Sequence, residues 1–258
     1  MSLWEFYKRE LRRLFFSLTL LFLIPAFILI NGIQFNVLVN LYSRRSMTAK
    51  TVKSSEKFLL NCTDSILRPF FGNMSIILMF FVPLFCMKSF ASEKANGELA
   101  LIQSYPVSDF SIFGGKFLAY FSVFILILSF SLTYCFVLKK LLPFSVKILG
   151  FSIVGMLLLG AFYIAICLFA SSLTENTIIS ALISFCLIFL FWISSFPAYL
   201  LGENFRIFCE HISPIMHLDY FLQGIIQSKD ILYFLNMSLF FSILTLFSLG
   251  NKHWMQND

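Results

Sequence analysis

The sequence predicts an all-α polytopic membrane protein, and two observations lead to that fold class. Of the 258 residues, 59% are hydrophobic and only 12% are charged, whereas a soluble domain has about 25% charged residues. Long stretches without Asp, Glu, Lys or Arg also recur along the chain. Each stretch can supply the roughly 20 apolar residues that cross a hydrocarbon core. We therefore expect a single transmembrane domain over residues 1–258.

Six apolar stretches predict six transmembrane helices. These helices are expected at about 14–34, 69–88, 115–138, 148–171, 176–198 and 231–250. No small-residue cleavage site follows the first stretch, so we expect it to stay in the chain as an anchor. The central parts of the spans lack ionisable residues, which argues against a proton- or cation-coupled transporter and against an intramembrane enzyme. Energy for any transport would then come from another polypeptide.

Residues 1–13, before the first span, predict a helix that lies in the membrane surface. Apolar residues recur at helical spacing and basic residues occupy the other face. The apolar face consists of Trp4, Tyr7, Leu11, Leu14 and Phe15, and the basic face of Lys8, Arg9, Arg12 and Arg13. The formal net charge of +6 suggests anionic lipid head groups as partners and not nucleic acid. An ordinary basic flank that sets orientation would explain the same residues.

The orientation of the chain is in conflict with a plain count of basic residues. With the N-terminus inside, the inner segments hold fewer Lys and Arg residues than the outer segments. The first helix usually dominates orientation, and its N-terminal flank carries four basic residues. We therefore expect a cytoplasmic N-terminus.

Residues 92–116 form a polar island between two apolar runs. Gly97 can end a helix that extends from the second span, and a short interfacial helix can follow, with Leu99 and Ile102 toward the membrane or a partner. Pro106 would break that helix, and Ser108 or Asp109 could cap the third span. A rigid pair of short helices would suit a docking surface on the cytoplasmic side. An ordinary solvated loop is the alternative.

A short amphipathic helix is also expected before the last span. Ser213 is a good N-cap and Pro214 a good first helical residue. One face of this helix would consist of Ile215, Leu218, Leu222, Ile225 and Ile226. The helix is too short to span, so we expect it at or in the outer leaflet.

No enzyme site or nucleotide site is predicted. The three histidines form no HExxH motif, and GGKF at 114–117 lacks the residues that a phosphate loop needs. His211, Met216 and His217 could bind a soft metal, but three such residues in a loop are more often plain surface, so no metal is expected. None of the six cysteines forms a CxxC pair. Cys62 and Cys209 lie in loops, and a disulfide between them is left open.

Two segments resemble a known family. FASEKANGELALIQSYPVSDFSIFGGKFLAY is similar to the signature of ABC-2 type exporter permeases. The matching positions include Phe90, Glu93, Lys94, Gly97, Leu99, Pro106, Val107, Ser108, Ile112, Gly115, Lys116 and Ala119. The chain departs from the family pattern at Glu98 and Ala100, where Thr and Glu are common. HISPIMHLDYFLQGIIQSKDILYFLN is similar to the segment before the last span in the gliding-motility permease branch, through His217, Phe221, Gly224, Asp230, Tyr233 and Phe234.

The resemblance implies a fold, partners and candidate residues. It implies an interfacial N-terminal helix, with Trp4, Arg9, Arg12 and Arg13, and a cytoplasmic coupling helix near 93–106. The coupling residues would be Glu93, Lys94, Gly97, Glu98, Leu99, Pro106 and Ser108. The short re-entrant or outer helix, a candidate gate, would contain Ser213, Pro214, His217, Phe221 and Gly224.

The same resemblance implies a dimeric membrane unit in the bacterial inner membrane, with both termini cytoplasmic. Two ATPase subunits would bind ATP and Mg²⁺, so the chain itself would carry no cofactor and no catalytic residue. An extracytoplasmic accessory protein often accompanies the gliding-motility branch. The expected function is the permease subunit of an ATP-driven exporter. The alternatives are a membrane anchor that transmits ATPase-driven motion without substrate passage, and a stand-alone channel.

Overall fold

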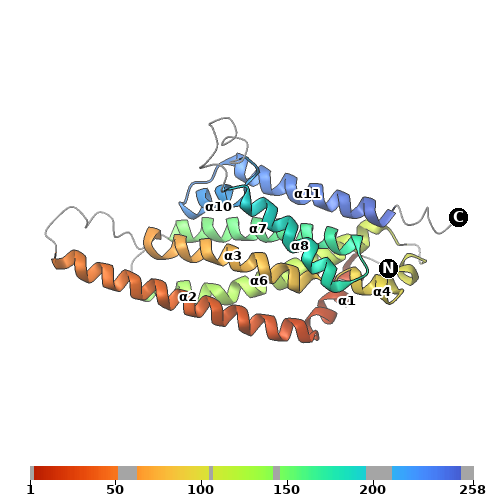
Figure 1. Ribbon diagram of the computed structural model, residues 1–258, viewed down its shortest axis with the longest axis horizontal. Coiled ribbons are helices and arrows are strands. Elements are labelled where there is room, and N and C mark those ends of the chain that lie inside the picture. The colour runs from red at the N-terminus through yellow and green to blue at the C-terminus, as the bar shows by residue number, and fades with distance from the viewer. Residues whose placement is uncertain (1–2, 52–62, 105–106, 142–145, 196–210, 251–258) are drawn as a thin grey trace.

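Long helices packed lengthwise make up the molecule (Figure 1). The computed structural model describes residues 3–51, 63–104, 107–141, 146–195 and 211–250, and these residues contain helices and no strand. The first half contains α1 (Leu3–Phe15), α2 (Leu18–Thr51), a short π-helix (Thr63–Leu67), α3 (Arg68–Cys86), α4 (Ala91–Ala95) and α5 (Glu98–Gln103). The second half contains α6 (Asp109–Leu141), α7 (Val146–Leu173), α8 (Thr177–Ile193), α10 (Pro214–Leu222) and α11 (Ser228–Gly250).

Within the described residues, five helical stretches are long and apolar enough to cross a membrane. They are Leu18–Met47, Ser65–Ala95, Asp109–Lys140, Val146–Leu173 and Ser228–Gly250. The remaining expected span corresponds to α8, an apolar helix of 17 residues, which at 1.5 Å per residue rises about 25 Å. Part of that expected span, 196–198, lies outside the described residues. The count of six spans therefore stays a prediction.

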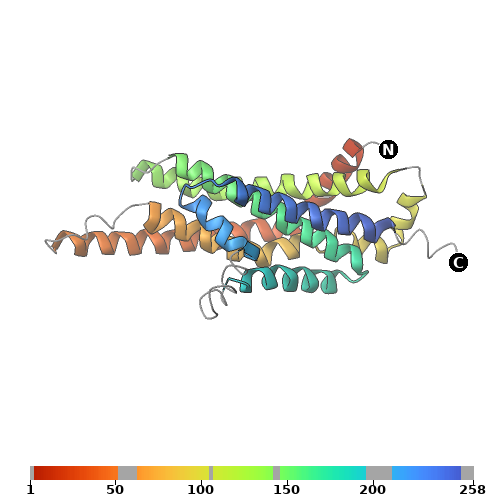
Figure 2. The same cartoon turned by 90° about the horizontal axis from the view of Figure 1, so that it is seen from above.

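Both ends of the described chain lie at one end of the bundle. Figures 1 and 2 show the N-terminus, α1 and α4 near the C-terminal end of α11. At the opposite end lie α10 and the C-terminal part of α2. The two ends are called below the α1 end and the α10 end.

Several helices extend beyond the boundaries expected from composition. The first and third spans were expected to end at 34 and 138, but α2 continues to Thr51 and α6 covers Asp109–Leu141. A charged residue ends a hydrophobic run without ending a helix, because Arg and Lys are good helix formers in water. Arg44 and Arg45 in α2, and Lys139 and Lys140 in α6, therefore lie within helix.

Helix α7 forms the centre of the bundle. In its most apolar stretch 67% of the residues are buried, against 17% for α2 and for α11. Two of its glycines allow close approach of aromatic rings. A Cβ atom at Gly160 would lie 2.1 Å from the Phe124 ring of α6, and one at Gly155 would lie 2.8 Å from Cβ of Phe221 in α10. Larger residues at these two positions would push α6 and α10 away from α7.

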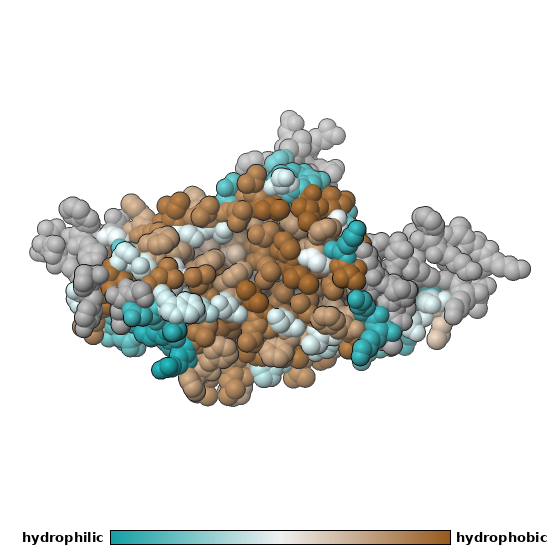
Figure 3. Space-filling model, turned by 180° about the vertical axis from the view of Figure 1, so that it is seen from behind, coloured by the Kyte–Doolittle hydropathy of each residue, from teal (hydrophilic) through white to brown (hydrophobic). Residues whose placement is uncertain are grey.

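The surface of the bundle is largely apolar. Figure 3 shows a broad hydrophobic band across the middle of the molecule and hydrophilic residues toward the ends. Large exposed apolar side chains include Phe22 and Leu29 of α2 and Ile243 and Phe247 of α11. A soluble monomer rarely exposes so wide an apolar surface. The chain is therefore an integral membrane protein.

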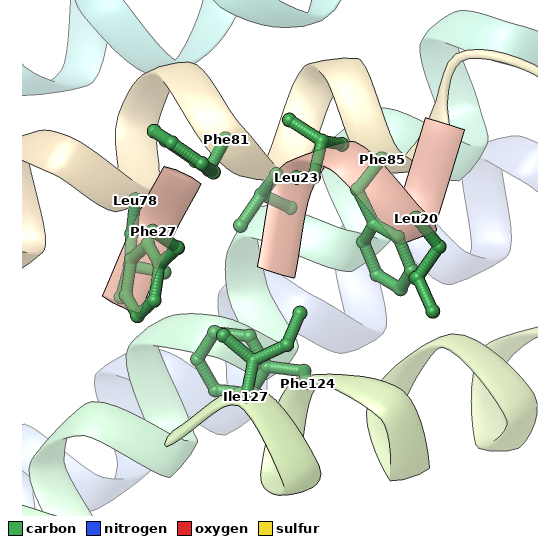
Figure 4. A pocket seen from close by; sticks show the side chains of 9 residues that line it. Leu20, Leu23, Phe27, Leu78, Phe81, Phe85, Phe124 and Ile127 are labelled. Atoms are coloured by element: carbon green, nitrogen blue, oxygen red, sulfur yellow. The ribbon is translucent and has the colours of Figure 1, made fainter. Parts of the chain in front are cut away.

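A small apolar cavity lies between α2, α3 and α6 (Figure 4). Its volume is about 10 Å³, which is about the space that one water molecule needs. Its lining consists of Leu20, Leu23, Phe27, Leu78, Phe81, Val82, Phe85, Phe124 and Ile127. This cavity is too small and too apolar to serve as a passage for a substrate.

Candidate functional site

The polar island at 92–116 folds into two short helices joined at Gly97. Helix α4 ends at Ala95, and the backbone amide of Gly97 donates a hydrogen bond to Lys94 O at 3.1 Å. Gly97 has φ +72° and directly precedes α5. Side chains other than Asn and Asp resist this left-handed conformation. The second span does not continue unbroken into α4, because α3 ends at Cys86 and a turn intervenes.

The start of α4 is bound to the end of α7. The buried hydroxyl of Ser171 accepts hydrogen bonds from the backbone amides of Phe90 and Ala91, each at 2.9 Å. These amides belong to the group at a helix N-terminus that has no partner within the helix. The Lys94 ammonium also donates to the carbonyl of Ser172. The position of α4 is thus determined by the central helix of the bundle.

A buried ion cluster joins three helices beneath α4. Lys116 of α6 is fully buried, and its Nζ lies 3.1 Å from Glu10 Oε1 of α1 and 2.9 Å from Glu93 Oε1 of α4. The same ammonium donates to the carbonyl of Ser89 at 2.7 Å. All three ammonium hydrogens therefore have acceptors, as a buried lysine requires.

Two arginines of α1 complete the cluster. Arg13 donates from Nη1 to Glu93 Oε1 at 2.7 Å and from Nη2 to Ser92 Oγ at 2.6 Å. Arg9 Nη2 lies 3.4 Å from Glu10 Oε1 and 3.6 Å from Glu93 Oε1. Three cations thus surround two carboxylates. We refer to Glu10, Glu93, Lys116, Arg9 and Arg13 as the ion cluster.

Burial and charge act in opposite directions on the titration of the cluster. Burial alone would raise the pKa of Glu10, but the charges of Lys116, Arg13 and Arg9 outweigh it and lower that pKa. Burial would likewise lower the pKa of Arg13, and the charges of Glu10 and Glu93 raise it. Glu10 and Arg13 are therefore both charged at neutral pH.

The structure corrects two expectations about this region. Glu93 was expected at a water-exposed docking surface, but it is fully buried. In α1, the buried stripe consists of Phe6, Glu10 and Leu14, so Leu14, expected on the membrane face, is buried within the bundle, whereas Trp4 is 58% exposed. The reason is that Lys116 needs a carboxylate inside the protein, and Glu10 lies at helical spacing from two apolar residues.

The glycine pair at 114–115 permits close packing near the start of α6. A Cβ atom at Gly115 would lie 2.6 Å from Cβ of Phe6 and 3.2 Å from the backbone nitrogen of Tyr7. Helix α1 thus crosses α6 at close range. This approach brings Glu10 to Lys116.

An exposed surface remains on α4 and α5, away from the ion cluster. Asn96, Glu98 and Leu101 are exposed, and Leu101 has 67% of its surface accessible. Leu99, on the opposite side of α5, is 5% exposed and packs inward. We refer to Asn96, Gly97, Glu98 and Leu101 as the α4–α5 tip. The α4–α5 tip therefore keeps side chains accessible that the bundle does not cover.

The residues that follow α5 were expected to end it and to cap the third span. Pro106 lies outside the described residues. Ser108 does cap α6, because its hydroxyl accepts from the backbone amide of Ser111 at 3.3 Å.

At the α10 end, the expected short helix is present but ends earlier and packs differently. Helix α10 begins at Pro214 and ends at Leu222, and Gly224 follows with φ +80°. Ile225 and Ile226 were expected to continue the apolar face of this helix but lie beyond its end. The buried face instead consists of Pro214, His217, Leu218, Phe221 and Leu222, and Leu218 and Phe221 pack against α7 at Gly155.

Ser213 and His217 are held by polar contacts within the α10 end. Ser213 occupies the N-cap position of α10, but its hydroxyl bonds with Ser195 and caps no amide. The Nδ1 atom of His217 lies 2.6 Å from Asp230 Oδ1, and the imidazole stacks on the Tyr233 ring at 4.1 Å. Among the described residues no group of three His, Cys, Asp or Glu side chains could hold a metal ion. Cys62 and Cys209 lie outside these residues.

Sequence reasoning did not include Glu10 and Lys116 among the site residues. Two signals could have identified them. Lys116 follows a Gly-Gly pair at the start of an apolar span, and Glu10 interrupts an apolar i, i+4, i+8 series in the N-terminal helix. A lysine and a glutamate that both lie on apolar helix faces are candidates for a buried pair.

Comparison with known families identifies the membrane domain. The family of ABC-2 family transporter proteins matches residues 32–250, which is most of the chain. No curated protein matches the chain significantly. Membrane subunits of this family generally lack catalytic activity of their own and work with an ABC ATPase subunit. The chain belongs to the ABC-2 family of transporter proteins and is a membrane permease subunit of an ABC transporter.

Proposed function

We propose that this chain is the permease of an ATP-driven exporter and receives ATPase movement through the α4–α5 tip. The observation that carries the proposal is the exposed tip held over a buried ion cluster. Coupling in trans requires a surface that is accessible to a partner and yet rigidly joined to the spanning helices. The α4–α5 tip has both properties.

The contacts of α4 give a route for transmitted movement. Displacement of the tip would act on α7 through Ser171 and on α6 and α1 through Glu93 and its partners Lys116 and Arg13. A buried Lys–Glu contact resists separation, because either charge left alone in the interior is costly. Glu93 and Lys94 therefore act in coupling as connections to the bundle, whereas Glu98 and Leu101 contact the partner.

The ATPase partner would supply the nucleotide chemistry. GGKF at 114–117 begins inside α6, and Gly115 packs against α1. This backbone cannot enclose phosphate groups as a phosphate loop does. ATP and Mg²⁺ are assigned to the partner ATPase, and this chain is assigned no catalytic residue.

A second permease copy would complete the pathway. The cavity between α2, α3 and α6 measures about 10 Å³, whereas α2 and α11 expose wide apolar surfaces. A pathway between two chains, with α8 counted as the sixth span, suits this distribution.

We place the α1 end in the cytoplasm, with both termini there, and the α10 end outside the bacterial inner membrane. Four basic residues precede the first span at the α1 end. Ser213, Pro214, His217, Phe221 and Gly224 then belong to an outer gate. The motif around His217 favours the gliding-motility branch and an extracytoplasmic accessory protein.

A charge reversal at the tip tests the proposal. Glu98→Lys combined with Leu101→Ala should reduce both recovery of the ATPase with the chain in mild detergent and stimulation of its turnover. Lys139→Glu is the matched control, because Lys139 is also exposed and lies near the other end of α6. Wild-type association in the tip variant would contradict the proposal.

Substrate flux separates the exporter from its alternatives. Vesicles with the chain and its ATPase should accumulate substrate only with ATP. ATP hydrolysis that depends on the chain, without any flux, would favour an anchor that transmits motion. Flux through the chain without an ATPase would favour a channel.

A further inference from the structure

A hollow lined by basic residues lies on the side of α1 that faces away from the bundle, opposite the buried stripe. Its volume is about 420 Å³, and it is lined by Lys8, Arg9, Arg12, Arg13 and Phe16. Small-molecule sites commonly measure about 300–1,000 Å³. We propose that this hollow binds the head group of an anionic phospholipid and that the lipid chains follow the exposed apolar side of α2.

The charges around the hollow are incompletely neutralised. No ion pair joins Lys8 or Arg12 to any carboxylate among the described residues, although Lys8 lies over the Trp4 ring at 5.4 Å. Arg9 and Arg13 contact Glu10 and Glu93 but keep 40% and 38% of their side chains exposed. Four cations therefore line one hollow while the two carboxylates lie beneath it, fully buried. A phosphate group matches this arrangement, since arginine binds phosphate through paired donors.

The surroundings of the hollow favour a lipid over a soluble anion. Phe16, one of the residues that line the hollow, is 84% exposed and lies two residues before the start of α2. Leu18, Leu21 and Phe22 continue an exposed apolar surface along the first turns of α2. Because α2 can cross the membrane, the acyl chains of a lipid held at the hollow would lie along this surface, whereas a free phosphate or an acidic protein segment would gain nothing from it.

Binding at the hollow would also act on the ion cluster. Arg9 and Arg13 face the hollow on one side and hold Glu10 and Glu93 on the other. A phosphate group bound at the hollow would neutralise the positive charge of the four cations that Glu10 and Glu93 do not balance. The bound lipid thereby stabilises the packing of α1 on α4 and α6, independently of any ATPase.

Lipid retention by the purified full chain tests this inference. We would measure phosphatidylglycerol bound to the chain by native mass spectrometry, against phosphatidylcholine. Each cation removed near a lipid surface weakens binding about fivefold, so Lys8→Gln combined with Arg12→Gln should weaken phosphatidylglycerol binding about 25-fold. Phosphatidylcholine binding should not change. Lys139→Gln with Lys140→Gln is the matched control, since both lysines are exposed at the other end of α6.

A second variant tests the apolar part of the site. Phe16→Ser keeps every charge and should still weaken phosphatidylglycerol binding, whereas binding of soluble glycerophosphate should stay undetectable. Equal lipid retention in the Lys8/Arg12 variant and its control would overturn the proposal. So would displacement of the lipid by millimolar inorganic phosphate, or loss of ATPase association in that variant with unchanged lipid binding.

Discussion

The two ends of the bundle each bury a carboxylate-containing polar group, but they connect very different parts of the chain. At the α1 end, Lys116 joins Glu10 across 106 residues, and Arg13 joins Glu93 across 80. At the α10 end, His217 and Asp230 are 13 residues apart and join neighbouring elements. The first arrangement holds separate helices together, and the second holds a local turn. The buried group of the α1 end therefore joins α1, α4 and α6, whereas the buried group of the α10 end joins two successive helices, and the longer-range Arg68–Asp219 pair of the α10 end is exposed.

The largest difference between the two ends should appear when the charge of Lys116, the central cation of the ion cluster, is removed. Lys116→Met should destabilise the chain by about 3–5 kcal/mol, because Glu10 and Glu93 would remain buried without their shared partner. Unfolding of the purified chain in mixed micelles measures this loss. Adding Glu10→Gln and Glu93→Gln to the variant should recover part of the stability. A loss below about 1 kcal/mol would show that the cluster is not a structural connection.

Loss of the His217–Asp230 contact at the α10 end should destabilise the chain less. Asp230→Ala leaves the His217 imidazole buried without its carboxylate partner, which should cost about 1–3 kcal/mol. Asp230→Asn keeps an acceptor and should lose less. Recovery of the ATPase with the folded variant should match the wild type, and a marked loss would mean that the two ends are coupled more tightly than their contacts indicate.

Backbone geometry at the tip offers a smaller and more selective test. A Cβ atom at Gly97 would meet nothing within 4 Å, so Gly97→Val acts through its φ of +72° alone. We expect a cost of about 1–2 kcal/mol and a clear fall in ATPase stimulation as the tip changes shape. Gly97→Asn, which tolerates this conformation, is the control. Equal stimulation by Val and Asn variants would separate the tip from coupling.

The smallest effect is expected at an accessible ion pair of the α10 end. Arg68 donates two hydrogen bonds to Asp219, at 2.8 and 2.6 Å, but both side chains are more than a third exposed. Arg68→Ala should therefore cost at most about 1 kcal/mol. Unfolding in the same micelles measures it. A loss as large as that of Lys116→Met would remove the contrast between buried and exposed pairs.

Sequence patterns predicted the elements better than their ends and pairings. Apolar stretches located the long helices, Gly97 located the break between α4 and α5, and Ser108 located the start of α6. Each of these depends on local chemistry that a few neighbouring residues determine. The expected spans ended before α2 and α6 do, because a helix can continue into water beyond the length that crosses the membrane.

The ion cluster could not be derived from the sequence in the same way. Because Glu93 lies in a polar segment, the sequence predicts that it is exposed to solvent. Its burial depends on Lys116 and on the close approach of α1 that Gly115 permits. The buried face of α1 also depends on that partner, since Glu10 would otherwise avoid the interior. Pairings across 80 to 106 residues follow from the packing of helices, which hydropathy does not determine.

The separation of Glu10 and Lys116 sets an order for biogenesis. While ribosomes deliver the chain from its N-terminus, α1 is complete long before α6 has been made. Glu10 therefore needs water or lipid head groups around it until the third long helix is in place, and only then can α1 leave the interface and dock. A nascent chain truncated before Asp109 should keep α1 accessible to protease, and extension beyond α6 should protect it.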